Sequence, residues 1–228
     1  YYNGSQASIC DTFLMTADHM PEIIPIFPLT GALLLPFGQL PLNIFEPRYI
    51  TLIEDALGAG RLMGLVQPID LGPKKNNNSN EIYNTGCLGR ITEFTDPGDG
   101  RYEIVLTGIC RFIVKEELDL HRGYRRITAN YSPFVRDLES DESDIQNREG
   151  LLAALRQYFE HQNLAADWDA LNEVPDLVLV TTAAMGCPLQ PEEKQLLLEA
   201  NDLQGRAERL QTILEMAIHG NNVNTARH

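Results

Sequence analysis

The segment from Ile24 to Tyr49 constrains the fold most, because it predicts a strand, a loop and a helix in immediate succession. Ile24 and Ile26 alternate as in a strand, which prolines interrupt. A loop rich in glycine and proline follows at Gly31–Pro41. Pro47 suits the first position of a helix, where its missing N–H costs no hydrogen bond. Apolar residues at helical spacing continue from there, and Gly58 ends the run.

A second pattern, between Gly86 and Lys115, predicts a long β-hairpin. Gly86–Phe94 forms the first strand, Thr95–Gly100 the turn, and Arg101–Lys115 the second strand. The second strand places apolar residues on one face at a period of two: Tyr102, Ile104, Leu106, Cys110, Phe112 and Val114. Gly108 interrupts that face, which predicts a bend, a bulge or a close approach of another backbone. Leu62–Val66 and Arg125–Ser132 predict two further strands.

The composition changes at the acidic run Asp137–Asp144, after which helical patterns dominate. Leu151–Phe159 and Asp176–Met185 predict two helices, and Pro191 opens a third. The last helix carries an apolar stripe from Leu203 and is expected to end at Gly220. The acidic run is interpreted as a solvated linker, because it lacks the residue order of a calcium loop.

The formal net charge of −14 argues against nucleic acid as a partner, because phosphate backbones attract basic surfaces. No apolar run approaches the length of a membrane span, and residues 1–22 lack the pattern of a signal peptide. The four cysteines and five histidines are scattered without ligand spacing, so we expect buried reduced thiols, no metal and no cofactor. These features predict a cytoplasmic protein.

The pattern of Ile24–Tyr49, ending in Phe45-Glu46-Pro47-Arg48-Tyr49, resembles the N-terminal substrate-recognition domain of Lon proteases, which also occurs as a stand-alone bacterial protein. The hairpin residues Gly89-Arg90 and Gly108–Phe112 fit the same family. The resemblance implies an α+β fold, a PUA-like β pseudo-barrel with one early helix and a C-terminal helical bundle. The expected parts are an N-terminal extension (1–22), a β-rich domain (23–136), an acidic linker (137–145), a helical subdomain (146–220) and a tail (221–228).

Full-length Lon enzymes carry an ATPase and a Ser–Lys protease, and neither motif occurs within these 228 residues. We therefore expect no catalytic residues. Most of the family motif has a structural interpretation: Phe45 and Tyr49 as core, Arg48 as a partner of a carboxylate or carbonyl, and strand arginines that pair with acidic groups. The residues concerned are Phe45, Glu46, Pro47, Arg48, Tyr49, Gly89, Arg90, Gly108, Arg111 and Phe112.

The best candidates for partner binding are Leu33, Leu34, Leu35 and Phe37, because they make the Gly31–Pro41 loop more apolar than solvation requires. The alternative is that these residues cap an open end of the barrel.

The sequence supports two candidate functions. The first is a non-catalytic module that binds unfolded or hydrophobic polypeptide segments, or a protein adaptor, by strand addition. The alternative is a PUA-like RNA-binding protein, with Arg122, Tyr124, Arg125 and Arg126 as its basic cluster. Oligomeric state is not indicated.

Overall fold

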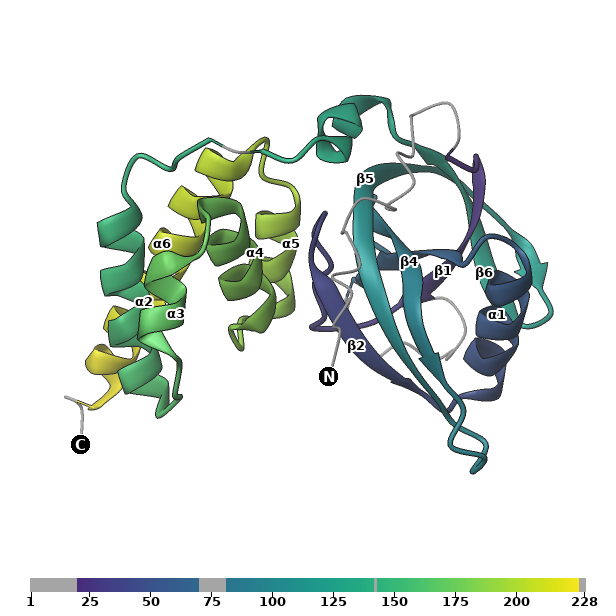
Figure 1. Ribbon diagram of the computed structural model, residues 1–228, viewed down its shortest axis with the longest axis horizontal. Coiled ribbons are helices and arrows are strands. Elements are labelled where there is room, and N and C mark those ends of the chain that lie inside the picture. The colour runs from purple at the N-terminus through teal and green to yellow at the C-terminus, as the bar shows by residue number, and fades with distance from the viewer. Residues whose placement is uncertain (1–19, 70–80, 142, 226–228) are drawn as a thin grey trace, which may run out of the picture.

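The computed structural model describes residues 20–69, 81–141 and 143–225, and Figure 1 shows a β-barrel with a group of helices beside it. The expected α+β architecture, with a β pseudo-barrel and C-terminal helices, is confirmed. The polar loop Gly72–Asn80 and the extension before Met20 lie outside the described residues. No helix in the described ranges combines the length and apolar character needed to cross a bilayer.

A closed ring of strands forms the barrel. β5 pairs with β4, β4 with β3, β3 with β1, β1 with β6, and β6 again with β5. β2 pairs with β5 alone and is therefore the edge strand of the described sheet. The strands are β1 (Ile23–Pro28), β2 (Gln39–Ile44), β3 (Leu62–Val66), β4 (Thr85–Thr95), β5 (Tyr102–His121) and β6 (Tyr124–Asn130).

The predicted hairpin is present as β4 and β5, and β5 continues to His121, beyond the predicted end. The pairing register shifts at Leu88/Gly89, opposite Gly108, so the predicted irregularity lies where the sequence placed it. The cause is a close backbone approach. A Cβ on Gly108 would lie 2.0 Å from the carbonyl oxygen of Leu35.

Helix α1 (Pro47–Gly58) begins at the predicted proline and buries Tyr49, Leu52, Ile53 and Ala56. The remaining helices are η3 (Ser132–Leu138), α2 (Arg148–Gln162), α3 (Trp168–Glu173), α4 (Asp176–Gly186), α5 (Pro191–Leu198) and α6 (Leu203–Thr225). The short helix α3 was not predicted, and its N-cap is Asp167, which accepts a hydrogen bond from the Ala170 amide. The prediction that the last helix ends at Gly220 is wrong, since α6 continues to Thr225.

Two apolar clusters form the core. The smaller one fills the barrel, because it draws side chains from each ring strand, and Phe112 is fully buried in it. The ring of Phe112 occupies the space where Gly64 and Gly86 have no side chain. The larger cluster passes from the outside of the barrel and α1 into the helical bundle without interruption. Barrel and bundle therefore share one core.

Candidate functional site

A groove of about 470 Å³ lies between the edge strand β2 and helix α4. Its strand wall is residues 37–41, and its helix wall is Leu177, Val178, Thr181, Thr182, Met185 and Gly186. None of these side chains is charged, although the protein carries a net charge of −14. Phe37 and Val178 are 46% and 45% exposed, so the two walls present apolar surface to solvent.

Hydrogen bonds at the start of β2 define which main-chain groups remain free. The Phe37 amide donates to the Gly108 carbonyl at 3.0 Å, and the Gly108 amide donates to the Gly38 carbonyl at 2.8 Å. The carbonyl of Gly38 therefore points toward β5. Because every second residue of an antiparallel strand bonds to the same neighbour, the main-chain groups of Leu40 and Leu42 also point toward β5. The main-chain groups of the intervening residues point away from β5, toward the open edge.

Those intervening residues are Gln39, Pro41 and Asn43. Proline has no N–H, and a proline inside a strand is tolerated where that missing donor faces an open edge. Pro41 therefore leaves one carbonyl but no donor at the centre of the edge. Without that N–H, β2 pairs less readily with the edge strand of another molecule, which protects the protein from aggregation. The amides of Gln39 and Asn43 on this edge have no strand partner among residues 20–69, 81–141 and 143–225.

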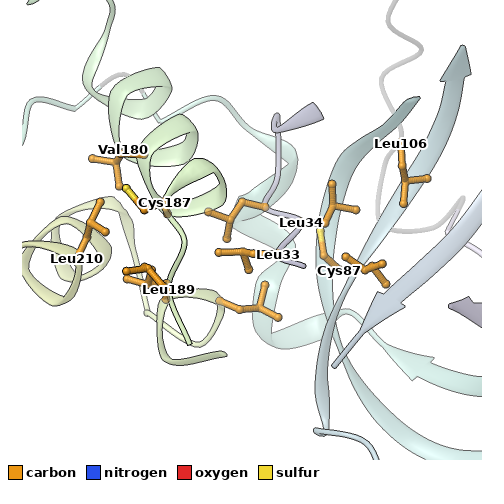
Figure 2. Close-up of a cluster of buried hydrophobic side chains, with 14 of the residues drawn as sticks. Leu33, Leu34, Cys87, Leu106, Val180, Cys187, Leu189 and Leu210 are labelled. Carbon is orange, nitrogen blue, oxygen red and sulfur yellow. The ribbon is translucent and has the colours of Figure 1, made fainter. Parts of the chain in front are cut away.

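The predicted binding residues divide into two groups. Phe37 lies on the groove, with a left-handed backbone φ of 65°. The exposed patch expected from Leu33, Leu34 and Leu35 is absent, because these side chains are only 2%, 1% and 0% exposed. Figure 2 shows Leu33 and Leu34 between the bundle, near Leu189, and the barrel, near Cys87. The leucines join barrel to bundle.

Two glycines of the predicted structural motif make that burial possible. A Cβ on Gly89 would lie 2.9 Å from Cδ2 of Leu34, and Gly108 admits the backbone of Leu35 in the same way. The loop can lie flat on β4 and β5 only where these strands carry no side chain. Gly38 has the corresponding role toward the bundle, since its Cβ would lie 2.2 Å from the sulfur of Met185.

The Phe45–Tyr49 motif is only partly a core element. Tyr49 is buried edge-on against Phe27 with ring centroids 4.4 Å apart, and burial raises its pKa. Arg48 pairs with Glu46 at 2.9 Å on the exposed surface. The prediction that Phe45 is core is wrong, since it is 66% exposed. Phe45 lies in the short connection between β2 and α1, outside both elements.

Arg111 is a buried ion-pair residue that fixes the bundle to the barrel. Its guanidinium contacts Asp137 at 2.7 Å and donates to the carbonyls of Leu198, at 3.0 Å, and Ala200. The sequence predicted that Arg111 pairs with an acidic residue. That residue, Asp137, was however assigned to the solvated acidic linker, and this assignment is wrong. Asp137 is no part of a solvated linker, because it lies in η3 with a side chain only 9% exposed. Arg90, the other strand arginine of the motif, is half-buried on β4.

Helix α5 is held by further polar contacts that sequence analysis missed. The Gln67 side chain donates to the Pro191 carbonyl at 2.8 Å and accepts from the Gly31 amide at 3.2 Å. Lys194 donates to the Gly31 carbonyl at 2.9 Å, and burial lowers the pKa of its ammonium. Arg206 donates to the Leu197 carbonyl at 3.1 Å, and burial lowers its pKa to about 10. Gln67 is uncharged and Lys194 stands between Glu193 and Gln195, so the sequence around them carries no local signal for these contacts.

Two of the three arginines in the predicted basic cluster pair with carboxylates within the molecule. Arg122 pairs with Asp55, which also accepts a hydrogen bond from the Tyr124 hydroxyl at 2.8 Å. Arg125 pairs with Glu117 at 2.6 Å. Carboxylates thus already bind two of the three arginines that phosphates would contact, and the RNA-binding alternative is not favoured.

The described thiols and histidines offer no nucleophile or metal site. Cys87, Cys110 and Cys187 are free and buried, as expected. Burial raises the pKa of Cys110 to about 12 and that of Cys187 to about 11, so both stay protonated at neutral pH. His121, His161 and His219 are exposed, and within the described ranges no three metal-ligating side chains gather.

Comparisons with known proteins agree with this architecture. The family model described as the ATP-dependent protease La (LON) substrate-binding domain matches residues 23–216. Lon protease of Desulfosudis oleivorans is 26% identical over 201 residues, covering 86% of this chain and 24% of that protein. Lon protease 2 of Sorangium cellulosum is 29% identical over 189 residues, covering 82% and 21%. The chain therefore spans about a quarter of the length of the curated relatives it matches.

Two solved structures share the fold. The Lon N-terminal domain protein from Xanthomonas campestris has a TM-score of 0.57 at 24% identity, with 83% of this chain and 97% of that chain covered. The N-terminal domain of the Mycobacterium avium complex Lon protease has a TM-score of 0.58 at 15% identity, with 85% and 98% covered.

Proposed function

Because the chain belongs to the family of the substrate-binding domain of ATP-dependent protease La (Lon), we propose that it is a non-catalytic receptor for extended apolar polypeptide segments. The groove between β2 and α4 receives the segment, and the protein serves cytoplasmic protein quality control or degradation. The observation that carries this proposal is a strand edge that no other described strand pairs with and that borders an uncharged, apolar groove.

Strand addition explains how such a site binds many sequences. The free main-chain groups of Gln39, Pro41 and Asn43 pair with any extended chain, whatever its side chains. Phe37, Val178 and Met185 then favour apolar side chains through burial. Methionine adapts to differently shaped neighbours, which suits a site of low selectivity. Binding is expected to be weak, because a flexible segment loses conformational entropy when it is ordered.

The absence of catalysis is part of the proposal. No phosphate-binding Walker loop occurs within these 228 residues, and the described thiols are buried and protonated. Purified protein is expected neither to hydrolyse ATP nor to cleave casein. Either activity, free of contaminants, would contradict the proposal.

The test of binding uses the variant Val178→Asp, which places a charge on the exposed wall of the groove. Its control is Met216→Asp on α6, because Met216 is exposed at 68% and does not line the groove. Each is titrated with a short unstructured peptide of alternating valine and threonine with a lysine at each end. We expect saturable binding to wild type and to the control, with amide shifts at Gln39, Leu40, Leu42 and Asn43. Binding to Val178→Asp is expected to be at least tenfold weaker. Equal binding to both variants, or none to wild type, would refute the groove as the site.

A further inference from the structure

The negative charge of the protein is concentrated in the part of the chain that follows the barrel. Residues 23–136 hold twelve acidic and twelve basic residues, whereas residues 137–220 hold 17 acidic residues and five basic ones. In the helical part, residues 143–225, eleven of the 13 aspartates and glutamates are exposed. Helix α4 belongs to this part, so the uncharged groove borders a strongly acidic body on its helix side.

The basic residues of the helical bundle do not offset these exposed charges, because internal contacts engage them. Lys194 and Arg206 are 7% and 5% exposed, and each donates to a main-chain carbonyl. Arg148 pairs with a buried aspartate of α4, and Arg209 donates to a carbonyl of α5 at 2.7 Å. Within residues 143–225 the only exposed lysine or arginine is Arg156, whose guanidinium lies 5.4 Å from the centre of a tryptophan ring. The solvent side of the bundle is therefore negative.

The two walls of the groove run beside each other over a similar length. Gly38 touches Met185, since a Cβ on Gly38 would lie 2.2 Å from the Met185 sulfur. The helix from Met185 back to Val178 and the strand from Gly38 to Pro41 both span about 10 Å. The groove thus has one end near Gly38 and Met185, and the other near Pro41 and Val178.

Exposed glutamates stand beyond both ends of the groove. At the Pro41 end, Glu103 of β5 lies opposite the residue of β2 that is two positions further along. Glu173 ends helix α3 at the same end, just before the helix wall begins. At the other end, Glu192 is in the first turn of α5, a helix whose lysine contacts the Met185 carbonyl at 3.5 Å. All three glutamates are exposed, so the groove is uncharged along its length and negative at its ends.

We propose that the groove prefers apolar segments flanked by lysine or arginine to apolar segments flanked by aspartate or glutamate. This inference rests on the proposed function and names the class of segment that the site accepts. The apolar centre of the segment enters the uncharged groove, and its basic flanks meet the carboxylates beyond either end. Acidic flanks are repelled, because like charges brought together across an interface oppose association.

The charge preference is measured with three peptides that share the valine–threonine core described above and carry lysine, glutamine or glutamate at both ends. At about 20 mM salt, we expect the lysine peptide to bind about fivefold more tightly than the glutamine peptide. It is expected to bind at least tenfold more tightly than the glutamate peptide. At about 1 M NaCl the three affinities are expected to agree within about twofold, because salt screens charges at the surface.

Two double variants separate the carboxylates at the groove from the total charge. Glu103→Gln with Glu173→Gln removes both charges at the Pro41 end. The control, Glu149→Gln with Glu160→Gln, removes the same charge from α2, which lies on the side of the bundle away from the barrel (Figure 1). We expect the first variant to reduce the preference for lysine over glutamate at least threefold and the control to leave it within about 1.5-fold. The melting temperature of each variant verifies that it is folded.

Equal affinity of the lysine and glutamate peptides at low salt would overturn this inference. An equal loss of preference in the two double variants would overturn it as well, since the carboxylates at the groove would then have no special part. In either case the proposed function stands if Val178→Asp weakens the binding of all three peptides. If wild type binds none of them, both fail.

Discussion

At the scale of single residues, Arg111 shows how much a buried charge depends on distant partners. Its guanidinium is held by Asp137 and by carbonyls near the end of α5, and its side chain is 4% exposed. Replacing Arg111 by alanine leaves Asp137 buried without a counter-charge. We expect the free energy of unfolding to fall by about 3–5 kcal/mol, measured by urea denaturation.

The matched control for that variant is Arg101→Ala, because Arg101 pairs with Asp99 at the surface with its own side chain 64% exposed. Solvent screens such a pair, so the urea midpoint is expected to stay almost unchanged. Equal losses from the two variants would mean that burial does not distinguish these ion pairs.

At the scale of elements, the loop before β2 depends on the glycines of the hairpin beneath it. Gly108→Ala places a methyl group on the Leu35 carbonyl, which belongs to backbone and cannot rotate away. The loop must then lift from β5, and we expect a loss of about 1–3 kcal/mol of stability together with weaker peptide binding at the groove. Urea denaturation and the peptide titration measure the two effects.

Gly58→Ala in α1 is the control, since a Cβ there would meet nothing within 4 Å. Alanine favours a helix more than glycine does, so this variant is expected to be as stable as wild type or more stable by up to about 1 kcal/mol. A Gly108→Ala protein with wild-type stability would show that the loop is not fixed by this contact.

At the scale of the whole molecule, the continuous core predicts that barrel and bundle unfold together. Leu34 is 1% exposed and belongs to the cluster that spans both parts (Figure 2). Leu34→Ala is expected to remove about 2–5 kcal/mol. Both the fluorescence of Trp168 in α3 and the amide signals of β5 should report the same lowered urea midpoint. A shift in only one of the two signals would contradict a shared core.

Much of the fold could be predicted because its signals are local. Period-two alternation indicated β5, Pro47 and Pro191 marked the starts of two helices, and Gly108 marked the irregularity of the hairpin. Each signal acts through sterics or hydrogen bonds over a few residues. The family motif likewise depends on sequence alone.

The candidate site depended on contacts that no local pattern contains. Leu33–Leu35 and Phe45 are all apolar, yet the leucines are buried and Phe45 is exposed. The difference arises because the leucines pack between barrel and bundle, whereas Phe45 does not. Lys194 meets the Gly31 carbonyl across 163 residues of chain, and α4 forms the second wall of the groove beside β2 in the same way. The sequence by itself determined which segments become strands and helices, since sterics and hydrogen bonding act between neighbours. Only the tertiary structure decided which apolar surface stays open, because burial depends on what the remote chain packs against.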